Sequence, residues 1–470
     1  MTGLHPDRLL PAGEGARAIA RELYEAVRAL PLFCPHTHID PWVLAEDRPF
    51  QDPYQLFVES DHYVQRILMS QGLSPAQLGL AGPAGVTAAS PREAWRVFAA
   101  NWHLFRGTPT RVWIEQQLVE VFGLDTPLGP DTADRLFDDL SALLATPEFR
   151  PRALFRRFGV EFLATTDAPH QPLTAHEKLQ NGDWHGPVVP TFRPDAVVDL
   201  EKLDWVRSVQ QLAEVADTDT STFDGYLEAL RIRRQDFIRL GATATDHGPV
   251  HPHAARAADR VVRDLYRRRL RGPVSQDEAE LFRSHMLMEL AQMSVDDGLV
   301  MQLHPGSTRN HDRAMFRDHG PDIGADIPHP VNFVHGLEEL LNAYGNVANF
   351  TLVVFTLDET TLARELAPMA AHYPALRIGA PWWFFDSPGG MRRHRDLVTE
   401  TAGFYNGAGF NDDARCFTSI PARHDMARRM DCGFLAELVA QHRLDLDEAH
   451  EIARLWTRDQ AREVYLPDRT

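Results

Sequence analysis

Hydrophobic and polar positions follow two different patterns along this chain. Residues 14–30 place apolar side chains at helical spacing in a run of good helix formers, which predicts an N-terminal helix. The short apolar run 32–34 stops at the polar segment 35–41, a pattern typical of a buried strand that ends in a loop. Residues 52–145 then look almost entirely helical. The helices expected there include Tyr54–Gln71, Pro91–Arg106 with Ser90 as its N-cap, and Arg111–Phe122.

A second pattern begins near residue 150, where short apolar runs end in polar residues and helical stretches follow. With the run at 32–34 there are eight such runs. Strands that alternate with helices indicate parallel βα units, and eight of them predict an α/β protein of the (β/α)8, or TIM-barrel, type. Reactive groups collect at the carboxyl ends of the strands in such a barrel. The runs after residue 150 are Val160–Thr165, Val188–Thr191, Ala242–Thr245, Leu299–Leu303, Phe350–Phe355, Leu376–Gly379 and Gly403–Gly409.

The charge balance narrows the range of possible ligands. The chain has 48 Lys and Arg against 66 Asp and Glu in 470 residues, a formal net charge of −18 with histidine neutral. A chain this acidic is a poor candidate for binding nucleic acid or anionic lipid, because both need a basic surface. If the ligand is an anion, positive charge must be concentrated in a pocket.

Cysteine content and apolar run length bear on the cellular compartment. Three cysteines in a long chain argue against a disulfide framework and for a reducing compartment. The chain has no apolar run of signal-peptide length at its start and no stretch of about 18 apolar residues. We therefore expect a cytoplasmic enzyme without a membrane partner. Its 22 histidines suit metal ligation or proton transfer near neutral pH.

A candidate metal site comes from the first and last runs. His36 and His38 follow the first strand, and residues two apart on a strand point the same way. Asp412 and Asp413 lie where the eighth strand should end, and strands one and eight are neighbours in a closed barrel. Two histidines and one aspartate form a credible catalytic metal site with open positions. The alternative is a pair of loop or core histidines.

Other candidates are a helical pair and an arginine. His62 and Arg66 share one helix face beside Tyr63, which suits a general acid–base set lowered onto the barrel mouth. The alternative is an ordinary polar helix surface. Arg193 follows the third strand between two prolines, and its guanidinium suits a carboxylate. The alternative there is a structural ion pair with Asp195.

The remaining candidates are single residues near strand ends. Asp246 follows the fourth strand and His304 the fifth, and each alone is more often a hydrogen-bonded structural group. Trp382 belongs to an aromatic run that suits core packing and a pocket wall. Arg415 should project to the same side as Asp413 if the strand continues. The methionine-rich run 286–293 indicates core packing rather than a cofactor site.

Together these segments resemble the uronate isomerase (glucuronate isomerase) family, an outlying branch of the amidohydrolase superfamily. They occur in the family's order over essentially the whole chain. One departure is Asp412-Asp413-Ala414-Arg415, where the family usually has Thr-Asp-Ser-Arg; alignment on Arg415 makes Asp413 the match and leaves Asp412 as the alternative. The matching segments are PHTHIDP (35–41), SDHYVQRIL (60–68), TTDAP (165–169), VVPTFRPDAVV (188–198), TDHG (245–248), MQLHPGSTRN (301–310), GAPWWFFD (379–386) and DDARCFTSIPARHDMARRM (412–430).

The resemblance implies both a fold and an activity. The implied fold is a distorted (β/α)8 barrel with a helical insertion after the first strand. Residues 1–50 would form the N-terminal helix and first strand, 51–150 the insertion, and 151–470 the rest of the barrel. The implied activity converts D-glucuronate to D-fructuronate and D-galacturonate to D-tagaturonate. The expected partners are a small hexuronate substrate, no nucleic acid, and copies of the same chain in a homo-oligomer.

Site roles follow by matching each residue to the family's motifs. Zn²⁺ is the expected metal, and no nucleotide cofactor is expected because no glycine-rich phosphate motif follows a strand. The expected assignments are metal binding by His36, His38 and Asp413; catalysis by His62, Tyr63, Asp413 and Arg415; and substrate binding by His38, Arg193, Asp246, His304, Trp382 and Arg415.

The chemistry of the strand ends favours an isomerase over a hydrolase. Binuclear amidohydrolases need a bridging ligand after strand four and a histidine after strand six, whereas strand six here ends in Phe355-Thr356-Leu357. At most a mononuclear site remains. Moving a proton from C2 to C1 through an enediol needs a base, an acid and a cationic group. The alternatives are a mononuclear metal-dependent hydrolase of a sugar-acid lactone or amide, and a non-catalytic sugar-acid binding protein.

Overall fold

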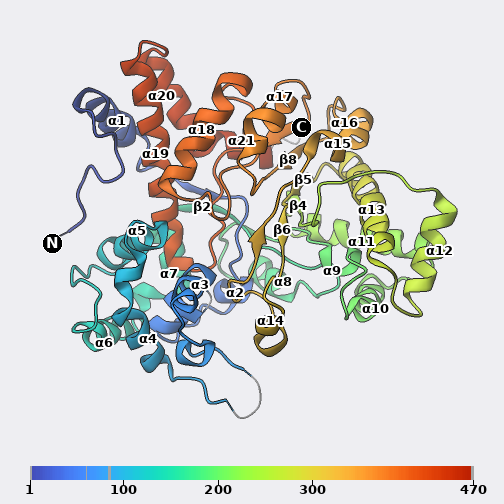
Figure 1. Cartoon of the computed structure of the whole chain (residues 1–470), viewed down its shortest axis with the longest axis horizontal. Coiled ribbons are helices and arrows are strands. Elements are labelled where there is room, and N and C mark those ends of the chain that lie inside the picture. Colours follow the sequence, from blue (N-terminus) through green and yellow to red (C-terminus); the bar gives the residue numbers. More distant parts are fainter. Residues whose placement is uncertain (1–2, 60, 83–85, 467–470) are drawn as a thin grey trace.

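A computed structural model describes residues 3–59, 61–82 and 86–466 (Figure 1). The chain has an α/β fold built on parallel strands. Apolar runs form strands at seven of the eight expected places. Leu352, Val353 and Val354 are completely buried, as expected for a strand covered on both faces. The parallel strands are β1 (Leu32–Cys34), β2 (Val160–Ala164), β3 (Val188–Val189), β4 (Ala244–His247), β5 (Val300–Leu303), β8 (Leu352–Val354) and β9 (Leu376–Ile378).

The strands are arranged side by side in chain order. One sheet has the order β1-β2-β3 and the other β4-β5-β8-β9, with every pairing parallel. Phe192 bridges to both Asp167 and Thr245, so it links the two sheets. At the far edge Ile378 pairs with Gly407. The backbone N–H of His38, just past β1, donates to the carbonyl of Ala414 at 2.9 Å.

Two expectations about strands are wrong in detail. Run 403–409 makes only a single bridge within the described residues, because Gly403 and Gly409 have φ of 70° and 76° and interrupt extended pairing. Strand β4 extends past the expected end, so Asp246 lies within it. A short antiparallel hairpin of β6 (Ser307–Thr308) and β7 (Ile327–Pro328) follows β5 and was not expected.

The segment between β1 and β2 is helical, as its pattern predicts. The expected helix 54–71 is interrupted, because Asp61 caps a new helix at His62 by accepting from the N–H groups of Tyr63 and Val64. Ser90 caps α4 as expected. The elements are α2 (Pro41–Glu46), η1 (Gln55–Glu59), α3 (His62–Ser70), η2 (Pro75–Leu78), α4 (Pro91–Ala100), η3 (Trp102–Phe105), α5 (Pro109–Gln116), η4 (Gln117–Val121), α6 (Ala133–Leu144), η5 (Pro147–Phe149) and α7 (Pro151–Arg157).

Helices surround the strands elsewhere. Helix α1 (Glu14–Val27) packs against α19 (Ile420–Ala440), so the N-terminal helix contacts a helix from the last part of the chain. The others are α8 (Thr174–Asn181), α9 (Asp195–Val198), α10 (Trp205–Ala216), α11 (Phe223–Arg239), α12 (Asp259–Arg269), α13 (Gln276–Asp297), α14 (Arg313–His319), α15 (Phe333–Gly336), α16 (Glu338–Tyr344), η6 (Leu362–Leu366), α17 (Ala367–Ala370), α18 (Pro388–Ala402), η7 (Phe417–Ser419), α20 (Leu446–Arg454), η8 (Leu455–Asp459) and α21 (Gln460–Tyr465).

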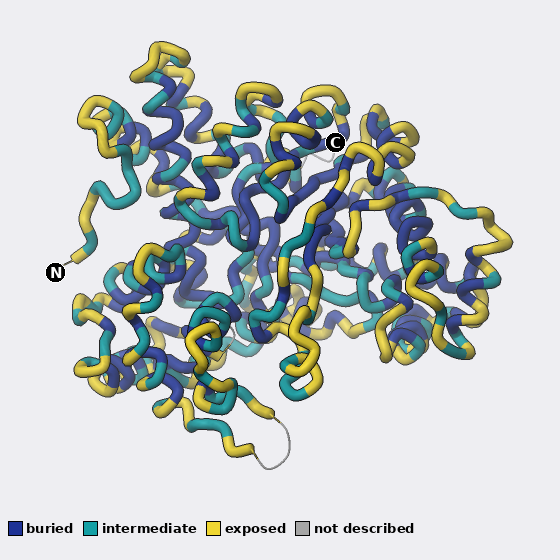
Figure 2. Tube along the Cα trace, in the orientation of Figure 1, coloured by how far each residue is buried: buried dark blue, intermediate teal, exposed yellow. Residues whose placement is uncertain are grey.

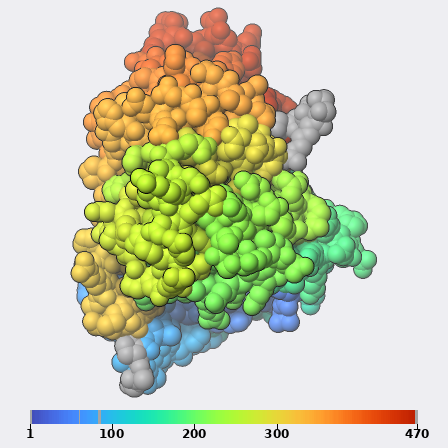
Figure 3. All heavy atoms as spheres, turned by 90° about the vertical axis from the view of Figure 1, so that its right-hand side faces the viewer, coloured from blue at the N-terminus to red at the C-terminus, as the bar shows by residue number. Residues whose placement is uncertain are grey.

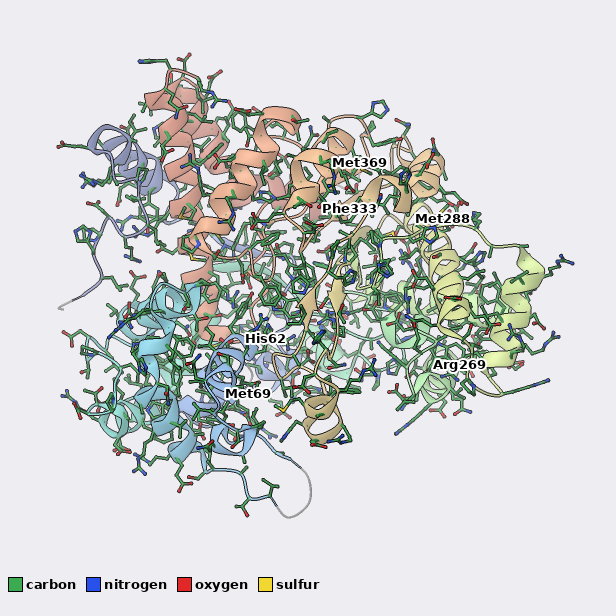
Figure 4. All side chains as sticks on the ribbon, in the orientation of Figure 1. His62, Met69, Arg269, Met288, Phe333 and Met369 are labelled. Atoms are coloured by element: carbon green, nitrogen blue, oxygen red, sulfur yellow. The ribbon has the colours of Figure 1, made fainter. Side chains whose placement is uncertain are left out.

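Burial follows this arrangement. The strands form the buried centre, while helices carry the exposed faces (Figure 2). Helices α10 to α13 lie next to one another on the face of the molecule shown in Figure 3, where they are coloured green to yellow-green. Met288 on α13 is 1% exposed, which confirms the core role expected for the methionine run (Figure 4). None of the helices in the described ranges has the length and apolar character that a membrane crossing needs.

Candidate active site

Most of the expected site residues line one cavity of about 490 Å³ at the carboxyl ends of the strands. A larger cavity of about 1150 Å³ lies between α1, α7 and α19. None of the expected site residues is among the described residues that line it. The smaller cavity is the better candidate, because histidines, carboxylates and arginines from many strands converge there. The expected residues that line it are His36, His38, His62, Arg193, Asp246, His304, Trp382, Asp413 and Arg415.

His36, His38 and Asp413 converge on one point. Asp413 Oδ1 lies 3.4 Å from His36 Nε2 and 3.2 Å from His38 Nε2. The three donor atoms all lie within 4.8 Å of one another. Burial lowers the pKa of His38 to about 4, so its imidazole is neutral at pH 7. Although burial opposes it, contact with His36 and His38 holds the pKa of Asp413 well below its usual range.

The neighbouring carboxylates Asp412 and Asp413 face different surroundings. Asp413 has φ of 49°, an uncommon left-handed conformation for a residue other than glycine. The Asp412 carboxylate accepts from the backbone N–H of Ala414 at 3.0 Å and contacts His424 Nε2 at 3.2 Å, and neither Asp412 nor His424 is among the described residues that line the cavity. Trp382 Nε1 donates to Asp413 Oδ2 at 3.1 Å. The turn therefore aims Asp413, and not Asp412, at the two histidines.

Arg193 is held between two carboxylates. Its Nε donates to Asp195 Oδ2 at 3.0 Å, and its Nη1 lies 3.3 Å from Asp246 Oδ2. His304 Nδ1 is hydrogen-bonded to Asp246 Oδ1 at 2.7 Å, and the His304 ring stacks on His36 with centroids 4.7 Å apart. Burial raises the pKa of Asp246, but Arg193 and His304 together hold it well below its usual range. The ion pair with Asp195 is thus present, and the arginine also faces the cavity.

Neighbours His62 and Tyr63 point in different directions. His62 lines the cavity from the first turn of α3, and Figure 4 shows it nearer the middle of the molecule than Met69. Burial and the positive charge of Arg415 hold the pKa of His62 well below its usual range, so it is neutral.

Tyr63 is not among the described residues that line this cavity. Its hydroxyl donates to Asp386 Oδ1 at 2.8 Å and accepts from the backbone N–H of Phe384 at 3.0 Å. Burial and Asp386 hold the pKa of Tyr63 well above its usual range. The structure thus brings His62, rather than the Tyr63 hydroxyl, to the cavity.

Several cavity residues were not singled out from the sequence. Arg309 and Asp326, which pair at 2.8 Å, belong to the segment after β5 that carries the unexpected hairpin. The Arg309 guanidinium lies 5.0 Å above the ring of Trp383. Asp167 follows β2 and also lines the cavity. Both Arg309 and Asp167 lie in segments that matched the family pattern, which was the available signal.

These features define a class: an α/β enzyme whose parallel strands end at a cavity with a histidine–aspartate cluster beside arginines. Comparison with known proteins identifies the family. A family model described as glucuronate isomerase matches residues 15–458. A uronate isomerase from Phenylobacterium zucineum is 52% identical over 453 residues, which cover 96% of this chain and 94% of that protein. The chain therefore belongs to the glucuronate isomerase family.

Solved structures agree with this assignment. The crystal structure of glucuronate isomerase from Caulobacter crescentus superposes with a TM-score of 0.97 at 49% identity, covering 100% of this chain and 98% of that one. The crystal structure of a uronate isomerase from Thermotoga maritima gives a TM-score of 0.92 at 29% identity, covering 99% and 100% of the two chains. The whole described fold is thus the fold of the family.

Proposed function

We propose that this enzyme interconverts D-glucuronate and D-fructuronate, and D-galacturonate and D-tagaturonate, by transfer of a proton between C2 and C1. The observation that carries this proposal is the family match over nearly the whole chain. The cavity supports it, because His36, His38 and Asp413 form one cluster with arginines nearby. A hexuronate is an anion, and Arg193 and Arg415 supply local positive charge in a chain of net charge −18.

We also propose that the fold is a distorted (β/α)8 barrel. The chain-order arrangement of parallel strands supports it, as do the bridges at Phe192 and Gly407 and the hydrogen bond from His38 to Ala414. Residues 51–150 are then a helical insertion between β1 and β2. The insertion supplies His62 to the cavity. Residues 1–50 and 151–470 supply the barrel.

The donor set fits one divalent metal ion. Asp413 Oδ1 is buried and has no hydrogen-bond partner among the described groups, although two imidazole nitrogens lie within 3.4 Å of it. Nitrogen and oxygen donors in this number suit Zn²⁺ with open coordination positions. His36, His38 and Asp413 would hold the ion. When bound, it would polarise a sugar oxygen as a Lewis acid.

The chain's own side chains have distinct roles in this proposal. Arg415, two residues beyond Asp413, binds the substrate oxygens nearest C1 and C2 and stabilises negative charge on the enediolate. Arg193, fixed by Asp195 and Asp246, binds the substrate carboxylate or a distal hydroxyl. Neutral His62 faces the cavity with Nε2 unpartnered among the described groups, so it is available for proton exchange.

Product analysis tests this function. Purified protein incubated with D-glucuronate or D-galacturonate, without nucleotide, should form a ketose of unchanged mass. A mass change of one water on a lactone or amide substrate would instead support the hydrolase alternative. Release of unchanged uronate would support a binding protein and contradict the proposal.

A further inference from the structure

The cavity contains a half-buried acid, Asp167, to which the proposed reaction assigns no role. Asp167 follows β2 and lies between the first strand, which leads to His36 and His38, and the third, which leads to Arg193. Its side chain is 14% exposed and lines the same cavity as the histidine–aspartate cluster. A carboxyl group in this position is expected to meet any hexuronate bound there.

The backbone of Asp167 is paired with the segment that follows β3 (Val188–Val189). Its N–H donates to the carbonyl of Thr191 at 3.0 Å, and its carbonyl accepts from the N–H of Arg193 at 2.9 Å. Behind it, the buried guanidinium of Arg233 donates to the carbonyls of Pro169 and Gln171. The carboxyl group is thus carried on a rigid strand end rather than on a free loop.

The Asp167 side chain is also held in place. Oδ2 accepts from the hydroxyl of Thr165 at 2.6 Å, and that hydroxyl lies 2.9 Å from His176 Nε2. His176 comes from α8, and burial lowers its pKa to about 4. Because His176 is neutral at pH 7, it supplies no positive charge that would keep the Asp167 carboxylate ionised.

The surroundings of Asp167 raise its pKa and so favour its protonated form. Burial is the main influence, and the negative charge of Asp40 adds to it. Hydrogen bonds from the Thr165 hydroxyl and the Thr191 backbone oppose the effect. The resulting pKa of Asp167 is about 7. A carboxylic acid that retains its proton can donate a hydrogen bond, whereas a carboxylate can only accept one.

We infer that Asp167 is a substrate-binding residue that works as a neutral carboxylic acid and donates a hydrogen bond to an oxygen of the hexuronate. The inference rests on the proposed isomerase function. Loss of the Asp167 proton removes the donor and adds a further negative charge to a cavity that already contains Asp246 and Asp413 and must receive an anion. Binding should therefore weaken at alkaline pH, while the proton transfer itself is unaffected.

Asparagine at this position provides a sharp test, because its amide is a permanently neutral hydrogen-bond donor of the same shape. In the parent enzyme the KM for D-glucuronate should rise about 30-fold between pH 6 and pH 8.5, following the fraction of Asp167 that is protonated when its pKa is about 7. In Asp167→Asn this rise should disappear, because the amide keeps its N–H donor at every pH. Asp167→Ala lacks both the donor and the titratable group, so its KM should stay about tenfold above the parent's pH 6 value at every pH.

A second variant tests the origin of the pH dependence. Thr165→Val keeps the shape of the buried side chain but removes the hydroxyl that stabilises the carboxylate, so the pKa of Asp167 should rise. The increase in KM should then begin at higher pH than in the parent. Asp219→Asn, at an exposed position that does not line this cavity, should leave the whole profile unchanged.

The possible outcomes separate this inference from the proposed function. If Asp167→Asn keeps the parental pH profile, or loses kcat at every pH, Asp167 is not a neutral donor and the inference is wrong. If the parent enzyme forms no ketose from either uronate, the proposed function fails instead. Circular dichroism and metal content of each variant should match the parent, which excludes unfolding or loss of the cluster.

Discussion

Replacing Arg415 should affect the chemical step more than any other change of a cavity cation. Its side chain is 29% exposed, and its ion-pair partner in the described structure is Asp322 at 3.6 Å. The guanidinium therefore remains available for substrate oxygens beside Asp413. A charge-assisted contact made mainly in the transition state lowers kcat when it is lost, and such contacts in a desolvated pocket contribute about 2–4 kcal/mol. Arg415→Met should thus reduce kcat roughly 30- to 1000-fold with a small change in KM.

Arg193 provides the comparison, because its surroundings are different. It faces Asp195 at 3.0 Å and Asp246 at 3.3 Å, and Asp246 is 1% exposed. Arg193→Met should raise KM, since it removes a binding contact, and should also lower stability by about 3 kcal/mol because it leaves buried carboxylates without their cation.

Steady-state ketose formation over a range of D-glucuronate concentrations, together with denaturant unfolding, measures both effects. If both variants keep kcat/KM within a few-fold of the parent, the two arginines are structural and the assignment of the cavity fails.

Three further changes test the metal cluster, a buried ion pair and a buried histidine. His38→Ala should lower the amount of metal bound per chain about tenfold or more, as measured by elemental analysis. If the parent enzyme keeps full activity after its metal is removed with a chelator, the metal is not needed for turnover. Asp386→Asn should reduce the free energy of unfolding in urea by about 3 kcal/mol, because it removes the charge 3.1 Å from buried Arg423; a loss below about 0.5 kcal/mol would contradict this. Burial lowers the pKa of His394 from 6.5 to about 3, so the unfolded chain binds a proton that the folded chain does not. His394 should therefore lower the free energy of unfolding by about 1.4 kcal/mol for each pH unit as the pH decreases below 6.5. In His394→Gln this contribution to the pH dependence of stability should be absent.

The strand ends could be predicted from the sequence because burial on both faces leaves a simple signal. A short apolar run followed by a polar residue identified the places where His36, Arg193 and His304 enter the cavity. The eighth strand could not be judged this way. Its glycines fit an apolar run, yet Gly403 ends helix α18 as its C-cap with positive φ, and Gly409 has positive φ where a side chain would collide with Ala461.

The directions of other site side chains depend on backbone angles that cannot be predicted from the sequence. His62 and Tyr63 are adjacent, and only the start of α3 at the Asp61 cap decides which of them faces the cavity. The choice between Asp412 and Asp413 depends on the left-handed turn at Asp413 and on the burial of His424. These residues come from distant segments, so spacing along the chain could suggest the cluster without fixing its geometry.

The most direct test of the central claim follows the C1 carbon of the substrate by NMR. Purified enzyme incubated with D-glucuronate labelled with ¹³C at C1, without nucleotide, should convert the aldehyde and hemiacetal signals into the hydroxymethyl signal of the ketose D-fructuronate. Persistence of the substrate signals alone, in protein that is folded and carries its metal, would contradict the assignment of this chain as an active uronate isomerase.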